Sequence, residues 1–384
     1  MLNLPPLYPI TDARLDRSLS AQVRRFGEAG FPLVQFRGKP LPDDVQMAEL
    51  RAALQASAGN GGWPRVVVND RADLALLAAA EGLPPWGLHL GQADLPPSEA
   101  ARLPGLAALH LGTSTHQASE WAAVDAACDH AGVGPVRGTA TKSDHSSPIG
   151  FDGLATGCAA LRAQGLAPVA IGGLGPGDLD ACFAAGAESV AMVGALAASE
   201  DPAGLLWKAQ AARWKARPIP LPGRSVVLAG SSGAGKSTLG AMLAARLGLP
   251  FHDLDDVLEA RAGASIPAIF AARGEAAFRA LESELLPGLL ASPSVVALGG
   301  GAWETEAVRR AAQDAGAAVL WLAERPEACW ARVAADPHRP LARDRGTFLA
   351  RHRARMARWS LLPCVLPLGR GPEEIVDGLL AGVC

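Results

Sequence analysis

Short apolar runs recur through the first half of the chain, each followed by a polar or glycine-rich loop and an Ala- and Leu-rich stretch. Such runs predict buried strands, and the stretches between them suit crossover helices. The runs are residues 7–11, 32–37, 65–70, 86–90, 108–114, 131–136, 168–173 and 189–194. Eight evenly spaced strand–helix units favour a closed (β/α)8 TIM barrel. A doubly wound open sheet is the competing architecture.

The second half begins with an apolar run at 225–229 that leads directly into a glycine-rich turn and a helix-like stretch. Further apolar runs at 294–298 and 318–322, with a helical pattern at 302–315 between them, continue the alternation of strands and helices. This order of elements predicts a compact P-loop NTPase-type α/β domain.

Three prolines, Pro218, Pro220 and Pro222, separate the two halves. Proline prevents the preceding helix from continuing and favours an extended spacer. We therefore expect an α/β barrel at residues 1–216, a proline-rich linker at 217–224 and a P-loop domain at 225–384.

Composition narrows the class of protein. Of the 384 residues 49% are hydrophobic and 19% are charged, and the net charge is −3. This balance describes a folded chain without the positive excess of an electrostatic nucleic-acid binder. No apolar stretch is long enough to span a membrane, and no signal peptide is evident. The six cysteines form no C-x-x-C pair, so we expect free thiols in a cytoplasmic protein. Assembly stays open, with a homodimer as one option.

Polar and glycine residues collect where the predicted barrel strands end, the place where barrels carry their active sites. They are Gln35, Arg37, Lys39, Asn69, Asp70, Asp94, Thr139, Thr141, Lys142, Gly173 and Gly194. Asp70 and Asp94 suit a shared Mg²⁺, although each could instead cap a helix. Glycine turns expose backbone N–H groups that can bind phosphate. Together these groups fit a diphosphate and a second phosphate, with pyrophosphate as a leaving group.

The motifs of the first half resemble those of thiamine-phosphate synthase, which joins hydroxymethylpyrimidine diphosphate to a thiazole phosphate. The resemblance rests on residues 7–12, 35–39, 68–71, 88–96, 112–116, 132–135, 139–142 and 170–173. It implies that the pyrimidine diphosphate is bound by Gln35, Arg37, Lys39, Asn69 and Lys142. It implies Mg²⁺ on Asp70 and Asp94, and a catalytic role for Lys142 and for Ser114 beside the pyrimidine. It also implies that the thiazole phosphate is bound by Thr139, Thr141, Gly173, Val193 and Gly194.

Two features qualify this resemblance. The chain departs from the family pattern at Gly38, where an acidic residue is usual, and at Arg137-Gly138, where Phe-Pro is usual. A related barrel, the thiazole tautomerase, keeps a histidine like His116 but generally lacks the two carboxylates, so it stays the alternative for this half.

The turn that opens the second half fits the P-loop pattern G-x-x-x-x-G-K-[ST] between a strand and a helix. Its residues are Gly230, Ser231, Ser232, Gly233, Ala234, Gly235, Lys236, Ser237 and Thr238. The amides of such a loop surround nucleotide phosphates, Lys236 reaches the β- and γ-oxygens, and Ser237 binds Mg²⁺. Asp253 is placed to support that Mg²⁺, and Asp255 to face a substrate hydroxyl. A glycine-rich helix cap alone would not need Lys236.

Residues 225–345 resemble shikimate kinase through D-x-D at 253–255, F-R at 278–279, G-G-G at 299–301 and R-P-L at 339–341. The resemblance implies that Asp255 activates the substrate hydroxyl and that Arg279, Gly301 and Arg355 hold its carboxylate. It implies that Arg332 and Arg339 assist the phosphates, with Lys236 and Arg339 catalytic, and that Glu282 anchors Arg279.

The last part of the chain departs from that family, because Trp359 stands where R-x-x-x-Y places a tyrosine after Arg355. For Arg353, Arg355 and Arg358 a solvated basic helix face is as good an interpretation as ligand contact. We expect a bifunctional enzyme with one Mg²⁺ site in each domain. Its substrates are a pyrimidine diphosphate, a thiazole phosphate, ATP and a small hydroxy acid. A second half that senses a nucleotide or ligand without kinase activity is the alternative.

Overall fold

The computed structural model describes residues 2–138, 147–334, 344–365 and 370–382. The chain divides into two compact units, Met1–Ala216 and Arg217–Cys384. Within the described ranges, no helix combines the length and apolar character needed to cross a membrane.

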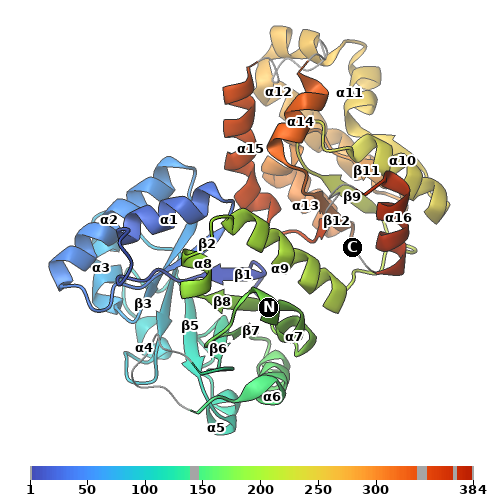
Figure 1. Cartoon of the computed structure of the whole chain (residues 1–384). Coiled ribbons are helices and arrows are strands. Elements are labelled where there is room, and N and C mark those ends of the chain that lie inside the picture. The colour runs from blue at the N-terminus through green and yellow to red at the C-terminus, as the bar shows by residue number, and fades with distance from the viewer. Residues whose placement is uncertain (1, 139–146, 335–343, 366–369, 383–384) are drawn as a thin grey trace. The chain divides into compact units, whose positions relative to one another are not determined.

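The first unit is a closed barrel of eight parallel strands (Figure 1). The strands are β1 (Leu7–Pro9), β2 (Leu33–Phe36), β3 (Arg65–Asn69), β4 (Gly87–Leu90), β5 (His110–Thr115), β6 (His130–Val133), β7 (Ala167–Ala170) and β8 (Ser189–Met192). Their spatial order is β1-β8-β7-β6-β5-β4-β3-β2. A parallel bridge between Ile10 and Gln35, with the Thr11 amide donating to the Gln35 carbonyl at 2.9 Å, joins the two ends of the sheet. The predicted TIM barrel is therefore confirmed, and the open sheet is excluded.

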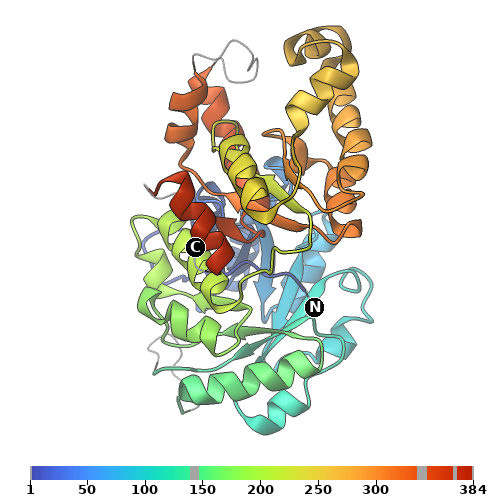
Figure 2. The ribbon, with the colours of Figure 1, turned by 90° about the vertical axis from the view of Figure 1, so that its right-hand side faces the viewer.

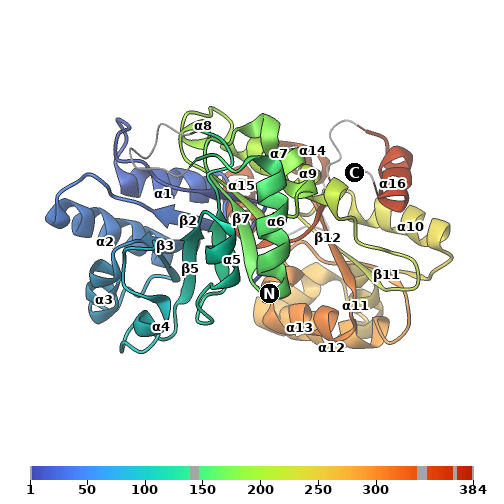
Figure 3. The same ribbon diagram turned by 90° about the horizontal axis from the view of Figure 1, so that it is seen from below.

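Helices surround the barrel, and Figure 3 shows α1, α2 and α3 following one another around the outside of β2 and β3. The helices are α1 (Leu19–Glu28), α2 (Asp43–Gly59), α3 (Ala72–Ala80), α4 (Pro97–Ala100), α5 (Ala118–Ala122), α6 (Gly150–Ala163), α7 (Leu179–Ala184), α8 (Gly194–Ala197) and α9 (Pro202–Ala216), with a 3₁₀ turn η1 (Pro176–Asp178). The main core lies between strands and helices. A second apolar cluster, which includes Tyr8, Leu33, Val67 and Val169, fills the inside of the barrel.

The second unit has a five-stranded parallel sheet in the order β10-β11-β9-β12-β13. The strands are β9 (Val226–Ala229), β10 (Phe251–Asp253), β11 (Val295–Ala297), β12 (Ala318–Leu322) and β13 (Cys364–Val365). The predicted strands at 225–229, 294–298 and 318–322 match β9, β11 and β12. The predicted helix at 302–315 is interrupted, because Thr305 has an extended backbone that separates η2 (Ala302–Glu304) from α13 (Glu306–Asp314).

The remaining helices of this unit are α10 (Lys236–Leu247), α11 (Leu254–Ala262), α12 (Ile266–Leu289), α14 (Pro326–Val333), α15 (Arg345–Trp359) and α16 (Pro372–Ala381). Helices α11 and α12 lie side by side (Figure 2). Shortly after Ala216 the chain contacts this second unit, since the Arg224 guanidinium donates to the Gly316 carbonyl at 2.6 Å.

Candidate active sites

Asp70 directly follows β3 at the carboxyl edge of the barrel, with an unusual backbone. Its φ of +63° makes it the single non-glycine residue in the described part of the chain with a left-handed conformation. Such strain is held in place by the surrounding structure and collects at functional sites. The Asp70 carboxylate pairs with Lys39 from the loop after β2. Burial opposes ionisation, but the hydrogen bond and charge of Lys39 outweigh it and hold the pKa of Asp70 below its usual value.

Asp94 lies beside Asp70 in the loop after β4. A Cβ on Gly91 would lie 3.0 Å from Asp94 Oδ2 and 3.9 Å from Asp70 Oδ1, and the Gly91 amide donates to Asp94 Oδ2 at 2.7 Å. Burial raises the pKa of Asp94, and the charge of Asp70 adds to that shift. Mg²⁺ commonly takes one or two carboxylates and completes its shell with water and phosphate. The pair therefore fits Mg²⁺, although the described residues contain no cluster of three acidic, His or Cys side chains.

Ser114, near the end of β5, contacts two residues whose part in the site the sequence analysis did not anticipate. Its Oγ lies 2.9 Å from His89 Nε2 on β4, and its carbonyl accepts a hydrogen bond from Gln92 Nε2 at 2.6 Å. His89 and Gln92 flank the β4 strand end, so their position in the predicted loop could have pointed to them. The two contacts fix the place of Ser114 at the barrel rim.

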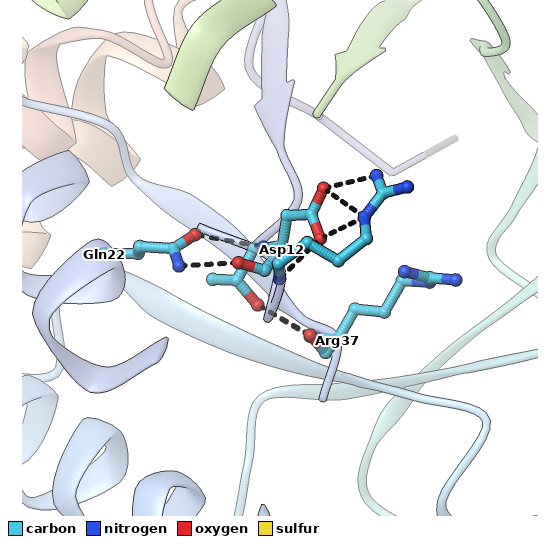
Figure 4. Close-up of polar contacts among 5 residues, drawn as sticks. Asp12, Gln22 and Arg37 are labelled. Carbon is cyan, nitrogen blue, oxygen red and sulfur yellow. Dashed lines mark hydrogen bonds and ion pairs between the residues drawn. The ribbon is translucent and has the colours of Figure 1, made fainter. Parts of the chain in front are cut away.

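The predicted diphosphate residues on β2 and β3 reach the same edge. Arg37 exchanges hydrogen bonds with Thr11 through its backbone, donating from N to Thr11 Oγ1 at 2.8 Å (Figure 4). Next to Thr11, the Asp12 backbone makes two bonds with the Gln22 side chain, which ties this corner to α1. The Arg37 side chain takes no part in these bonds. Gln35 Nε2 lies 3.5 Å from the Tyr8 hydroxyl. Asn69 ends β3.

The predicted phosphate turn lies on the same carboxyl rim, after strands β7 and β8 on the other side of the barrel from β3 and β4. Gly173 has a φ of +64°, and a Cβ there would collide with the Gly138 carbonyl, so only glycine fits. Gly194 begins α8, with Val193 immediately before it. Thr139, Thr141 and Lys142 lie outside the described residues.

The family departures have structural counterparts. Arg137 pairs with Asp178 at 2.8 Å, and its guanidinium lies 5.3 Å from the centre of the Phe151 ring. At Gly38 a Cβ would lie 2.8 Å from the Gln46 side chain, so an acidic residue there would require that side chain to move.

The P-loop of the second unit is a turn of three left-handed glycines between β9 and α10. Gly230, Gly233 and Gly235 have φ values of +140°, +81° and +94°. Lys236 is buried at the start of α10, and its ammonium donates to the carbonyls of Gly230 and Ser231 at 3.0 and 2.8 Å. The lysine is therefore held inside the curve of the loop, where phosphate oxygens bind in P-loops.

The rest of the loop lies next to two further predicted groups. A Cβ on Gly300 would lie 2.5 Å from Ser232 Oγ, which brings the glycine run after β11 against the P-loop. Arg332 from α14 donates to the Gly233 carbonyl at 2.9 Å and pairs with Glu324. Thr238 is exposed on α10, and Ala234 is buried. Arg339 lies outside the described residues.

Ser237 and Asp253 form the candidate metal site of this unit. The Ser237 hydroxyl donates to Asp253 Oδ2, while Asp253 Oδ1 accepts from the Asp255 amide at 3.0 Å and caps α11. A hydroxyl beside a carboxylate, next to a phosphate-binding loop, fits Mg²⁺.

The predicted acid-binding residues surround the glycine run at 299–301. A Cβ on Gly299 would lie 2.8 Å from Asp255 Oδ1 and 2.7 Å from Glu282 Oε1. A Cβ on Gly301 would collide with Arg279 Nη2 and lie 2.7 Å from Arg355 Nη2. Arg279, Gly301 and Arg355 are thus brought together, with Asp255 nearby.

The support beneath these arginines was partly expected. Arg279 Nη1 donates to Glu282 Oε2 at 2.7 Å, which confirms the predicted anchor, and Nη2 also reaches Glu275. Burial raises the pKa of Glu282 to about 7, with Arg279 opposing the shift. Arg355 Nη1 donates to the Gly300 carbonyl at 2.9 Å. Glu275 and Glu304 were not predicted, because no local motif marks them.

Comparison with known proteins separates the two halves. The family described as thiamine monophosphate synthase matches residues 7–196, and the family described as shikimate kinase matches residues 232–361. The chain is 39% identical over 199 residues to the thiamine-phosphate synthase of Chloroflexus aurantiacus, covering 51% of this chain and 86% of that protein. It is 40% identical over 166 residues to the shikimate kinase of Ruegeria pomeroyi, covering 42% and 85%.

For one further relative the matched segment covers only about half of its length. The thiamine-phosphate synthase of a Synechococcus species is 40% identical over 198 residues, which cover 50% of this chain and 53% of that protein. The chain thus spans about half the length of this relative. Among solved structures, thiamine phosphate pyrophosphorylase from Pyrococcus furiosus is 25% identical with a TM-score of 0.46, covering 56% of this chain and 98% of its own. Shikimate kinase from Acinetobacter baumannii, solved with shikimate, is 29% identical with a TM-score of 0.38, covering 44% and 94%.

A closed barrel with polar strand ends and a P-loop α/β unit with an arginine-lined glycine run together define a chain of two enzyme-type domains. The chain belongs to the thiamine-phosphate synthase family through its first half and to the shikimate kinase family through its second half.

Proposed function

We propose that the chain is a bifunctional enzyme of thiamine and hydroxy-acid metabolism. Its barrel joins hydroxymethylpyrimidine diphosphate to a thiazole phosphate, giving thiamine phosphate and pyrophosphate. The observation that carries this proposal is the facing pair Asp70 and Asp94 with Lys39 beside them. Two carboxylates so close together favour a divalent metal ion. The Lys39 ammonium beside them suits the oxygens of a diphosphate.

Each group at the rim has a role in this reaction. Asp70 and Asp94 hold Mg²⁺, which when bound supplies positive charge that stabilises the departing pyrophosphate. Gln35, Arg37, Lys39, Asn69 and Lys142 bind the diphosphate oxygens. The bond from the pyrimidine methylene carbon to the diphosphate oxygen breaks, and a bond from that carbon to the thiazole nitrogen forms.

The remaining groups position the two rings. Ser114 lies beside the pyrimidine and is oriented by His89 and Gln92. The backbone N–H groups around Gly173, Val193 and Gly194, with the hydroxyls of Thr139 and Thr141, bind the thiazole phosphate.

We propose that the second unit transfers the γ-phosphoryl group of ATP to a small hydroxy acid such as shikimate. The observation that carries this is the meeting of Arg279 and Arg355 at Gly301, close to Asp255. Two guanidiniums suit a carboxylate, and a nearby aspartate can accept the proton of a hydroxyl on the same molecule. The hydroxyl oxygen then bonds to the γ-phosphorus, and ADP leaves.

The P-loop residues serve this transfer. Residues 230–238 surround the phosphates, and Lys236 exchanges its carbonyl partners for phosphate oxygens. Ser237 and Asp253 hold Mg²⁺, which when bound offsets phosphate charge, while Arg332 and Arg339 assist. We also propose a cytoplasmic location, supported by the free, buried thiols of Cys128, Cys182 and Cys329.

The test uses the full chain and two variants that serve as controls for each other. Asp94→Asn is expected to abolish pyrophosphate release from the two thiamine precursors and to leave ATP turnover unchanged. Asp255→Asn is expected to abolish phosphoryl transfer from ATP to a panel of shikimate and related hydroxy acids, and to leave pyrophosphate release unchanged. No pyrophosphate from the wild-type chain would exclude the synthase and leave the tautomerase alternative. ATP binding without a phosphorylated acid would favour a sensing unit.

A further inference from the structure

Three arginine contacts converge on the short turn that follows the glycine run of the second unit. Arg309 from α13 donates to the carbonyls of Trp303 and Glu304 at 2.8 and 2.7 Å. Arg358 from α15 donates to the same Glu304 carbonyl at 2.8 Å. Guanidinium groups from two helices, α13 and α15, therefore hold the turn η2 in place.

Helix α15 touches this segment at two points one helical turn apart. Arg355 donates to the Gly300 carbonyl at 2.9 Å, and Arg358 reaches Glu304 three residues further along the helix. Side chains three residues apart lie on the same helix face. The two contacts hold the segment from Gly300 to Glu304 along that face, so the basic helix face of the sequence analysis is in part an internal contact.

The carboxylate of Glu304 adds a charge interaction. Its Oε2 lies 3.5 Å from Arg358 Nη1, while Oε1 is buried with no hydrogen-bond partner among the described residues. Burial raises the pKa of Glu304, and the guanidiniums of Arg358, Arg355, Arg309 and Arg279 oppose the shift in that order. Burial lowers the pKa of Arg355, and the charge of Glu304 is the strongest effect opposing it. Glu304 thus acts electrostatically on a guanidinium of the acid site.

The segment so fixed lies next to both acid-binding arginines, since Arg355 bonds the Gly300 carbonyl and Gly301 adjoins Arg279. Gly301 lies where a Cβ would collide with Arg279 and lie 2.7 Å from Arg355. A small shift of this segment would change the positions of both guanidiniums relative to each other. Misplacement of binding groups by about 1 Å can reduce catalysis about a hundredfold.

We propose that Arg358 and Glu304 are positioning residues that hold the glycine run against α15 and so set the spacing of Arg279 and Arg355. The acceptor is then an acid whose single carboxylate fits that fixed pair. This inference rests on the proposed kinase function of the second unit.

The test measures shikimate binding to the full chain by calorimetry in the presence of ADP, so that no turnover is needed. Arg358→Met keeps much of the side-chain stem but removes the donors. We expect it to weaken shikimate binding about tenfold or more and to leave the affinity for ADP within twofold of wild type. Glu304→Gln is expected to act in the same direction, and Arg358→Lys to restore part of the affinity. Arg353→Met, exposed on the same helix, is the matched control and is expected to change neither affinity.

The outcomes separate the inference from the proposed function. If Arg358→Met binds shikimate as well as wild type, or loses ADP affinity to the same degree, the positioning role is wrong while the proposed function stands. A fall in melting temperature with unchanged shikimate affinity would likewise reduce the contact to structural support. If the wild-type chain neither binds shikimate nor consumes ATP with any acid of the panel, both proposals fail.

Discussion

Lys39 and Asp70 form an ion pair between the loop after β2 and the end of β3, and Asp70 adopts a left-handed backbone where the pair forms. The lysine thus supplies the positive charge that a metal ion would otherwise bring to this carboxylate. A divalent cation that binds Asp70 and Asp94 competes with the Lys39 ammonium, whereas a bound diphosphate offers that ammonium another partner.

Replacing Lys39 separates these two effects. Lys39→Met is expected to bind Mn²⁺ several-fold more tightly than wild type without substrate, because the competing ammonium is gone. The same variant should bind the pyrimidine diphosphate more weakly. Mn²⁺ titration followed by electron paramagnetic resonance measures the first effect and calorimetry the second. Lys208→Met, exposed on α9, is the control. Unchanged Mn²⁺ affinity in Lys39→Met would show that the ion pair does not compete.

We expect the Asp94 carboxylate to lower the stability of the folded barrel. Its carboxylate is partly buried beside that of Asp70, and both burial and the second charge disfavour its ionised form. Asp94→Asn removes one charge and retains an oxygen for the Gly91 amide. We expect a higher melting temperature for the first unit together with loss of pyrophosphate release, the usual exchange of stability for activity at a functional site. A lower melting temperature would contradict this.

Gly301 should tolerate no side chain. Gly301→Ala places a methyl group against Arg279 and Arg355, so we expect the KM for the acid to rise about tenfold or more while the KM for ATP is unchanged. Gly288→Ala is the matched control, because a Cβ on this exposed residue of α12 meets no atom within 4 Å. Steady-state kinetics of the full chain distinguish the two variants. Equal acid KM values would place the carboxylate elsewhere.

Acid should destabilise the second unit through His352. The side chain is buried against Trp359, and burial lowers the pKa of His352 from 6.5 to about 4. The unfolded chain therefore binds the proton more readily, so this contribution to stability is intact above about pH 6.5 and is lost as the pH falls towards 4. Between pH 6.5 and 5 the loss is about 2 kcal/mol.

Replacing the histidine tests this dependence. His352→Phe is expected to flatten the pH dependence of the melting transition of the second unit over this range, measured by calorimetry of the full chain. The transition of the first unit serves as an internal control, because His130, whose pKa burial lowers to about 3, is unchanged in this variant. An identical pH profile in His352→Phe and wild type would contradict the assignment.

The order of strands and helices could be predicted from the sequence more fully than the contacts between side chains. The eight barrel strands could be predicted because each is buried on both faces and therefore reads as a continuous apolar run. Strands β10 and β13 were not predicted, because they have only three and two residues and therefore show no periodic pattern. The break at Thr305 escaped for a similar reason, since an extended residue between two helical turns changes no hydrophobic spacing.

Contacts between distant residues were the least predictable part. Motifs placed Asp70, Asp94, Lys236 and Asp255, because each stands at a strand end or in a phosphate loop. Glu304 and Arg358 belong to no such motif and are 54 residues apart, so only the packing of α15 on η2 brings them together.

The closure of the barrel also bears on how the chain folds during synthesis. Residues Leu7, Tyr8 and Pro9 pair with Val190, Ala191 and Met192, so the first strand has no partner on that side until the eighth strand has left the ribosome. The nascent barrel therefore exposes an open sheet edge for most of its translation. Because the second unit follows in sequence, that edge can close before the second unit has left the ribosome, and the barrel can mature first.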